Sequence, residues 1–494
     1  MSRGKPIFYS AVLLTAVNLL LRFVGTGFQV FLSSRIGAEG IGLLQLVLSV
    51  GGMALVAGMA GIRTATMYLT AEELGHGKAG NTRWVLSGCV VYSILFSACI
   101  ASLLYFLAPF LADRWIGHPE TVDAIRIFGA FLPVNCLTGV MVGYFTGAQR
   151  IRTLAAVEVA EQILSMLCTI TLLNVWAGHD PAKCCLAVVM GSALGACLTL
   201  AALTVLRLRE QQKAASPIPV ARRLLDTALP LAAADDLRTG ISTVENLMVP
   251  RRLALFSGHL SPLAAFGTVC GMVFPILMFP IAILYGMTEL LVPELARCRA
   301  AGSQNRIEYL TKRSLRIALL FGTLCAGILF LTARELCHSL YSSVDAGVYL
   351  RWFAPLAVML YCDAVTDSII KGLGQQKASV RYNIFTNVMD VAFLYYLLPK
   401  YGIQGYFFSF LITHAINFIL SIRKLIFISR VQIDWRMPVM TLAVAIGAVW
   451  AAGFVGVPLL RAVCYAILLI CGLFLTNVLT REDTDWVKGL VYRK

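Results

Sequence analysis

The sequence has little charge: only 14% of its 494 residues are Asp, Glu, Lys or Arg, whereas 59% are hydrophobic. A soluble domain carries roughly 25% charged residues, so this composition excludes a chain that folds mainly against water. Apolar runs repeatedly reach the roughly 20 residues that a helix needs to cross a bilayer. The sequence therefore predicts an all-α integral membrane protein.

Motifs of hydrolytic, metal-dependent and nucleotide-driven chemistry are missing as well. HExxH, GxxxxGK[ST] and GxSxG do not occur. The 14 cysteines lie mostly in apolar runs, no CxxC pair is present, and Cys184-Cys185 has no His at ligand spacing. The cysteines are therefore interpreted as small buried hydrophobes, and the sequence predicts no enzyme, no bound cofactor and no assignable metal site.

Positive charge is in excess, with 41 Lys and Arg against 26 Asp and Glu and a net charge of +15. A nucleic-acid partner is one explanation, but the basic residues collect in alternate loops, above all in 207–223 and 297–316. This asymmetry is typical of membrane topology, in which Lys and Arg stay in the cytoplasm. It predicts a multi-pass protein of the cell membrane, surrounded by bilayer lipids, with both termini cytoplasmic and no nucleic-acid partner.

The apolar segments number about fourteen by length and hydropathy. Arg3 and Lys5 precede the first one, which lacks a small-residue cleavage pattern and is therefore expected to remain as a helix. The predicted spans are 7–32, 41–70, 84–109, 123–149, 154–176, 184–206, 224–250, 263–292, 312–333, 347–370, 379–398, 403–422, 437–457 and 459–478.

Two halves of the chain match each other at a constant offset of 225 residues, which pairs Gly42 with Gly267 and Gly147 with Gly372. The offset corresponds to six predicted helices, which is an even number, so matching helices cross the membrane in the same direction and the repeat is parallel. Such a repeat predicts two six-helix lobes around a central cavity. The predicted organisation is an N-lobe, a basic cytoplasmic linker, a C-lobe, two additional helices and a cytoplasmic tail, which occupy 1–206, 207–223, 224–425, 426–480 and 481–494.

Several short motifs resemble a known family. They are Arg22-Phe-Val-Gly25, the run from Arg35 to Gln45, Gly143-Tyr-Phe-Thr-Gly-Ala-Gln149, Ala228-Leu-Pro230 and Lys371-Gly-Leu-Gly-Gln-Gln376. Together they resemble the multidrug/oligosaccharidyl-lipid/polysaccharide (MOP) exporter superfamily, most closely its stage V sporulation protein B and polysaccharide flippase branch, near the lipid II flippases. The resemblance covers about residues 1–480. It implies a flippase that moves an undecaprenyl-diphosphate-linked oligosaccharide from the inner to the outer leaflet without ATP hydrolysis.

Candidate substrate-binding residues are Arg22, Arg63 and Arg238. Intramembrane arginines usually face a cavity or a partner, and guanidinium suits bidentate phosphate contacts. Lipid II flippases, which the chain resembles, carry cavity arginines on their first helices, a pattern that Arg22 matches well and Arg63 more loosely. Arg63 could instead extend toward an interface, and Arg238 could neutralise Asp235 three residues earlier.

Lipid II flippases, which the chain resembles, are thought to use a sodium site between helices 7, 11 and 12. The resemblance therefore implies a coupling ion, which is either Na⁺ or H⁺. The nearest candidates are Asp236, Asn387, Asp390 and Thr413. Asn383, Asn387 and Asp390 share one helical face, and at the repeat offset they match Glu158, Gln162 and Ser165. Oxygen ligands suit a hard cation, but interhelical hydrogen bonds explain these stripes equally.

A further carboxylate pair, Asp363 and Asp367, has the spacing of a cation site or proton relay. The two could equally pair with Arg351 or line a wet cavity, and the sequence does not decide between these roles.

Two other functions remain open at this point. One is a cation-coupled multidrug or toxin exporter of the same superfamily, against which the helix count and the arginines of the first two helices argue. The other is a membrane scaffold for cell-wall or spore-cortex synthesis, with cell-wall synthesis enzymes as partners. The flippase reading instead predicts a lipid-linked sugar as the principal partner.

Overall fold

The computed structural model describes residues 4–76, 78–178, 180–209, 220–256, 261–432 and 434–479. Within these ranges the side chains of 4–16, 18, 234, 289 and 290 are not described. Arg3, most of the predicted linker and the predicted tail lie outside the described residues.

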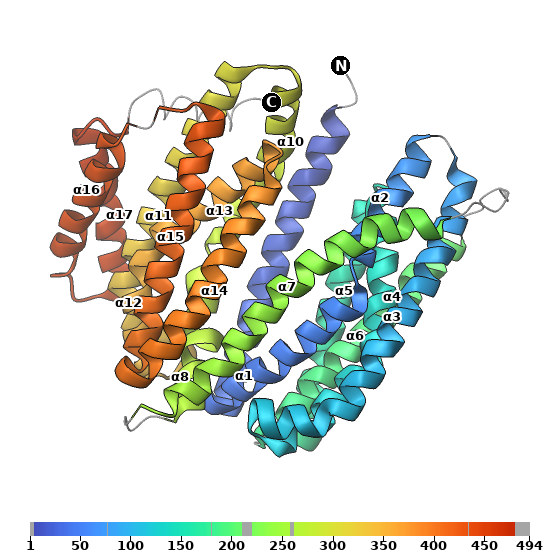
Figure 1. The fold of residues 1–494 in the computed structure, drawn as a ribbon. Helices are drawn as coiled ribbons and strands as arrows, with labels where there is room; N and C mark the ends of the chain where they lie inside the picture. Colours follow the sequence, from blue (N-terminus) through green and yellow to red (C-terminus); the bar gives the residue numbers. More distant parts are fainter. Residues whose placement is uncertain are drawn as a thin grey trace. The chain divides into compact units, whose positions relative to one another are not determined.

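Within the described ranges, all regular secondary structure is helical, which agrees with the predicted all-α class (Figure 1). Short 3-10 or π-helical turns extend or join several helices. The helices are α1 (Gly4–Met59), α2 (Ile62–Gly75), α3 (Thr82–Phe110), α4 (Val122–Gly147), α5 (Ile151–Leu172), α6 (Pro181–Leu208), α7 (Ala221–Leu253), α8 (Pro262–Gly267), α9 (Phe274–Met278), α10 (Ile281–Ala300), α11 (Gln304–Tyr341), α12 (Val344–Phe353), α13 (Ala357–Gly372), α14 (Gln376–Tyr401), α15 (Ile403–Ser429), α16 (Arg436–Ala452) and α17 (Pro458–Leu475).

Nine helical stretches in the described part of the chain are long and apolar enough to cross a membrane. A tenth is added if Pro262–Met278 and Ile281–Ala300, which meet at a bend of 54°, form one span. The protein is therefore a multi-pass membrane protein, as predicted. The count of fourteen crossings and the orientation of the termini stay predictions.

Helix α1 continues through the loop that was predicted between the first two spans, and a single residue turns the chain there. Residues 33–40 were expected to connect two spans, but α1 continues through them and departs from helical geometry only at Gly37, with φ 69° and ψ −178°. A positive φ is accessible to glycine without a steric penalty. Figure 1 shows the chain reversing its direction in this part of α1.

A second break divides the predicted span 41–70. Ala60 and Gly61 both have positive φ, 43° and 72°, and α2 begins at the next residue. A Cβ on Gly61 would meet the carbonyl oxygen of Ala228 in α7. Glycine at this break therefore permits both the backbone turn and the close approach of α7.

The chain divides into two compact units. The first consists of Met1–Gly271 with Leu394–Gly402, and the second of Met272–Phe393 with Ile403–Lys494. The lobe boundaries predicted from the repeat stay a prediction.

In the first unit, one apolar cluster joins α2 and α3 to the beginning of α7. Its buried members include Ile62, Leu69, Val85, Leu224 and Ala228. Burial of these side chains fixes the first turns of α7 against α2, which places the charged residues at the ends of both helices near one another.

In the second unit, the helix pair α16 and α17 packs on α11 (Figure 1). Tyr465 is fully buried, packs on Gly327, and donates its hydroxyl hydrogen to the carbonyl oxygen of Thr323 at 2.9 Å. A tyrosine in an apolar contact needs such a partner for its hydroxyl, so this contact specifies how the C-terminal helix pair docks.

Candidate functional site

The two predicted arginines of the first helices lie on different helices of the first unit. Arg22 is half-buried on α1, where Thr26 Oγ1 donates to its carbonyl oxygen at 2.9 Å. Arg63 is the second residue of α2, and its side chain is exposed. Both residues fall within the candidate membrane span Leu19–Gly75.

Close packing against α4 fixes the backbone at Arg63. A Cβ on Gly143 would meet the carbonyl oxygen of Arg63, and one on Gly147 would lie 2.6 Å from the carbonyl oxygen of Met67. Small residues at such points let two helices approach closely in a membrane. The contact with α4 thus holds the backbone of α2 while the side chain of Arg63 remains exposed.

A carboxylate on α5 lies near this arginine, with a second carboxylate beside it. Glu158 is half-buried and close enough to interact electrostatically with both Arg63 and Glu161. Thr199 on α6 donates its hydroxyl hydrogen to Glu161 Oε2 at 2.6 Å. The first unit therefore contains a polar region made by α2, α5 and α6, in which Arg63 is the positive group.

The charged residues of α7 differ in exposure. Asp235 and Arg238 are exposed, whereas Asp236 is half-buried. Within the described residues, Oδ1 of Asp236 is buried without a hydrogen-bond partner. Asp236 interacts electrostatically with Tyr92 on α3, so it faces the α2–α3 side of the first unit.

The other three predicted cation ligands lie in the second unit, and the structure brings two of them together. Ser409 Oγ donates to Asp390 Oδ1 at 2.5 Å, and Thr413 Oγ1 lies 3.2 Å from the same oxygen. All three residues are buried, while Asn387 is half-buried. These contacts are interhelical hydrogen bonds between α14 and α15, the alternative role that the sequence had left open.

A second carboxylate contact lies between α13 and α15. Asn417 Nδ2 donates to Asp363 Oδ2 at 3.0 Å. On the next turn of α13, Asp367 forms an ion pair with Lys371 at 2.6 Å and accepts a hydrogen bond from Ser379 on α14. The two aspartates that the sequence left undecided therefore have different partners.

The sequence analysis selected Thr413 on α15 but missed the polar stripe to which it belongs. Ser409, Thr413, Asn417 and Ser421 recur every four residues and are all buried, so they share one face of the helix. The signal was available as hydroxyl and amide residues at helical spacing, but such residues are compatible with an apolar span and do not interrupt it.

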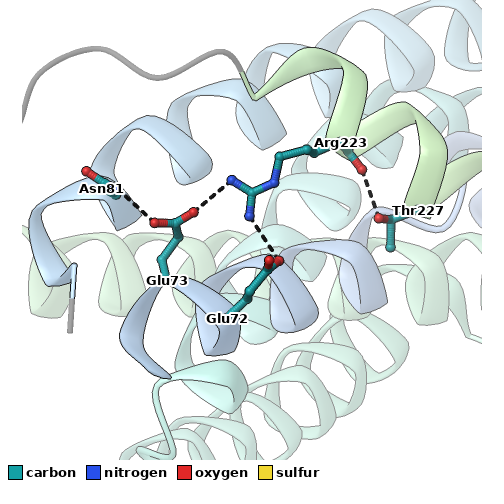
Figure 2. Close-up of polar contacts among 5 residues, drawn as sticks. All are labelled: Glu72, Glu73, Asn81, Arg223 and Thr227. Carbon is teal, nitrogen blue, oxygen red and sulfur yellow. Dashed lines mark hydrogen bonds and ion pairs between the residues drawn. The ribbon is translucent and has the colours of Figure 1, made fainter. Parts of the chain in front are cut away.

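An ionic cluster links α2 to the start of α7, as Figure 2 shows. Arg223 Nη1 lies 2.8 Å from Glu73 Oε1, and Nη2 lies 2.9 Å from Glu72 Oε2. Asn81 Nδ2 donates to the second oxygen of Glu73 at 2.8 Å. The hydrogen bonds to Glu73 and Glu72 raise the pKa of the Arg223 guanidinium above its usual range.

The described residues contain no group of three or more His, Cys, Asp or Glu side chains that could hold a metal ion. Any ion at Asp390 or Asp363 would consequently depend on neutral oxygen ligands beside a single carboxylate.

Family models match most of the chain in two consecutive parts. A model described as "Polysaccharide biosynthesis protein" matches residues 8–245, and the MatE model matches residues 252–396.

Two curated relatives come from Bacillus subtilis (strain 168). "Stage V sporulation protein B" is 23% identical over 415 residues, which cover 81% of this chain and 80% of that protein. "Sporulation protein YkvU" is 21% identical over 386 residues, which cover 76% and 84% of the two chains.

Solved structures share the fold. "Lipid II flippase MurJ, inward closed conformation" superposes with a TM-score of 0.71 at 12% identity and covers 93% of this chain and 98% of its own. An inward-facing multidrug resistance MATE family transporter of the MOP superfamily gives 0.66 at 16% identity, covering 86% and 100%.

The chain belongs to the MOP exporter superfamily. Both family models and the fold agree on this assignment, and the sporulation relatives place the chain in the stage V sporulation protein B-like branch. The proteins of this MOP exporter group are transporters and flippases, which agrees with the prediction that the chain is not an enzyme. The roles of the individual site residues stay predictions.

Proposed function

We propose that this MOP exporter is a flippase that moves an undecaprenyl-diphosphate-linked oligosaccharide from the inner to the outer leaflet by alternating access. The similarity to stage V sporulation protein B and the polysaccharide biosynthesis family model support this substrate class. Enzymes of cell-wall synthesis are the proposed partners that supply or consume the lipid-linked sugar.

The physical task explains what the protein must contain. A diphosphate and several sugars cannot cross hydrocarbon unaided, because burial of unpaired charge and polar groups is strongly unfavourable. A flippase must offer the head group a polar, cationic environment while the lipid tail remains in the bilayer. Guanidinium groups are suited to this task because they bind phosphate oxygens through two parallel hydrogen bonds.

The observation that carries the proposal is the placement of Arg63. Its backbone is fixed by the close contact with α4, its side chain is exposed within a candidate span, and Glu158 lies nearby. An exposed charge within a span must meet water, a carboxylate or a charged ligand. Arg22 and Arg238 are proposed as further contacts to the diphosphate, with Glu158 available to receive Arg63 when the substrate has left.

The test is a flipping assay with purified protein reconstituted in liposomes that contain a fluorescent undecaprenyl-diphosphate sugar. Protein-dependent loss of the probe from one leaflet, without added ATP, is the expected result. Liposomes with an unrelated membrane protein provide the control. Absence of transfer in both directions, with protein that is folded and inserted, would contradict the proposal.

A second candidate is a cation-coupled drug exporter, favoured by the match of the MatE model to residues 252–396. Transport of a cationic dye by the same liposomes, competed by drugs and not by the lipid-linked sugar, would support that alternative.

A further inference from the structure

One side of α2 is exposed, although the helix lies within the candidate membrane span Leu19–Gly75. The exposed residues follow the helical repeat and together cover one continuous side. They are Arg63, Thr64, Tyr68, Ala71, Glu72 and Gly75. The residues of α2 between these positions are buried or half-buried, so the helix has one packed side and one accessible side.

Neighbouring helices hold the packed side of α2. Ile62, Ala65 and Leu69 belong to the apolar cluster with α3 and the beginning of α7. On α4, Gly143 and Gly147 approach α2 so closely that a Cβ on either glycine would meet a carbonyl oxygen of α2. Small residues at such contacts permit close packing of helices in a membrane. The accessible side is consequently presented by a helix whose position is fixed.

The accessible side of α2 is polar. Arg63 carries a charge, Thr64 a hydroxyl, and Glu72 a carboxylate that pairs with Arg223 at 2.9 Å (Figure 2). Charged residues within a membrane span usually face protein or a water-filled cavity rather than lipid. We therefore expect this side of α2 to face water, which is the environment that the head group of a lipid-linked sugar requires.

Tyr68 is the aromatic residue on this polar side, and it is 66% exposed. Thr64 lies one helical turn before it, so the hydroxyl of Thr64 and the ring of Tyr68 share a face of α2. The negative face of an aromatic ring attracts positively polarised hydrogens, and one face of a sugar ring consists of C–H groups of this kind. Tyr68 is therefore suited to stack on a sugar, while the Thr64 hydroxyl can both donate to and accept from sugar hydroxyls.

The spacing between Tyr68 and Arg63 fits a sugar that is bonded to a diphosphate. The two residues are five positions apart, which corresponds to about 7.5 Å along the helix axis. Guanidinium suits the diphosphate, and the first sugar of a lipid-linked oligosaccharide is bonded directly to that diphosphate. A head group with its phosphates at Arg63 therefore brings its first sugar ring to the turn of α2 that carries Tyr68.

We propose that Tyr68 is a sugar-binding residue: its ring stacks on the sugar next to the diphosphate, and Thr64 forms hydrogen bonds with hydroxyls of the same sugar. This assignment rests on the proposed flippase function and deepens it, because it names the part of the head group that α2 recognises. Arg63 binds the diphosphate, which the carrier lipid without a sugar also has. Tyr68 distinguishes the lipid that carries a sugar from the lipid that does not.

The experiment compares two short-chain lipids, farnesyl diphosphate and farnesyl diphosphate that carries one N-acetylglucosamine. Isothermal titration calorimetry measures the Kd of each lipid for purified protein in detergent. The wild type should bind the sugar-bearing lipid about fivefold to tenfold more tightly, as expected of one aromatic contact. The readout is the ratio of the two Kd values, because a general loss of stability does not change which lipid is preferred.

Variants of Tyr68 separate stacking from other roles of the side chain. Tyr68→Ala should abolish the preference for the sugar-bearing lipid and leave the affinity for farnesyl diphosphate unchanged. Tyr68→Leu, which keeps an apolar side chain without a ring, should behave in the same way and serves as the second variant if Tyr68→Ala does not fold. Tyr68→Phe keeps the ring and should retain most of the preference.

Two further variants provide the comparison. Arg63→Ala/Glu158→Gln should weaken the binding of both lipids and preserve the ratio of their Kd values, because it removes a contact to the diphosphate. Tyr396→Ala is the matched control, since Tyr396 on α14 is 67% exposed, and it should bind both lipids like the wild type.

The proposal is overturned if the wild type binds the two lipids equally, if Tyr68→Leu retains the preference, or if Tyr396→Ala loses it to the same extent as the Tyr68 variants. In each of these cases the flippase function stands, provided that the liposomes transfer the lipid-linked sugar. If the wild type binds neither lipid, the role of Tyr68 is overturned as well, and the liposome assay decides separately whether the flippase function fails with it.

Discussion

Arg223 on α7 and Glu73 on α2 form an ion pair of 2.8 Å between residues that are 150 positions apart in the chain. Glu73 and Glu72 lie in the last turn of α2, and Arg223 is the third residue of α7. Acidic groups are unfavourable at a helix C-terminus, and basic groups at an N-terminus, because of the helix macrodipole. Pairing offsets both unfavourable placements, so this contact holds the two helix ends together (Figure 2).

The two glutamates should contribute unequally to stability. The side chain of Glu73 is 5% exposed and that of Glu72 is 43% exposed. Glu73→Gln should therefore lower the free energy of unfolding by about 1–3 kcal/mol, and Glu72→Gln by less than about 1 kcal/mol. Thermal unfolding in detergent measures the difference.

A matched control for this prediction lies on α7 itself. Asp226 pairs with Arg222 at 4.0 Å, and both side chains are largely exposed. Asp226→Asn should leave the Tm unchanged, since exposed ion pairs contribute little. Equal effects of Glu73→Gln and Asp226→Asn would show that the Arg223 contact does not stabilise the fold.

Gly143 on α4, compared with Gly52 on α1, provides a test of helix packing. Gly143→Ala places a methyl group against the Arg63 carbonyl oxygen, whereas a Cβ on Gly52 would have nothing within 4 Å. Gly143→Ala should destabilise the protein by about 1–3 kcal/mol through overpacking. Gly52→Ala should be neutral or stabilising by up to about 1 kcal/mol, because alanine favours helix. An equal Tm for both variants would contradict the close α2–α4 contact.

The fold class was predictable because a membrane protein must satisfy its backbone within helices and because hydrocarbon thickness sets their length. The predicted spans 123–149, 154–176 and 184–206 each have a helix in the structure, in α4, α5 and α6. The connection at Gly37 was not predictable in this way, because a single glycine with φ 69° replaced the expected loop.

The candidate site was predictable only in part. Hydropathy and motif position selected Arg63 and Asp390 as candidates. Side-chain contacts between segments that are distant in the chain could not be predicted, because they leave no pattern in the local sequence. The contact of Asn417 with Asp363 joins residues 54 positions apart, and Arg223 with Glu73 is more distant still. Spacing along a single helix shows which residues share a face, and does not show what faces them from another helix.

Topology gives a prediction that does not depend on transport. The basic segment 297–316 is predicted to be cytoplasmic, and Ser303 lies in its exposed turn. A Ser303→Cys variant should react with a membrane-impermeant maleimide only after permeabilisation of the cells. Glu120→Cys, which lies on the predicted outer side, should react in intact cells. The parent protein gives the background from its own cysteines, and labelling of Ser303→Cys in intact cells would reverse the orientation.

Arg22 and Arg63 are predicted to bind the diphosphate of the lipid-linked sugar. Arg22→Ala should lower the flipping rate in liposomes by at least about tenfold, equivalent to about 1.4 kcal/mol, with membrane insertion preserved. Arg22→Lys should restore only part of the activity, because an ammonium group offers charge without the planar fork of guanidinium. Arg114, which is exposed outside the candidate sites with a side-chain exposure of 76%, supplies the control variant Arg114→Ala, which should flip normally.

Arg63 requires a different design because Glu158 lies near it. Arg63→Ala would leave this half-buried carboxylate without its positive neighbour, which should lower the stability of the protein. A loss of flipping in this variant could then come from lower stability or from lost substrate binding. The double variant Arg63→Ala/Glu158→Gln removes the carboxylate charge as well and should recover the Tm while flipping stays low. If the double variant recovers both properties, Arg63 only neutralises Glu158. If it recovers stability alone, the guanidinium is needed for the substrate.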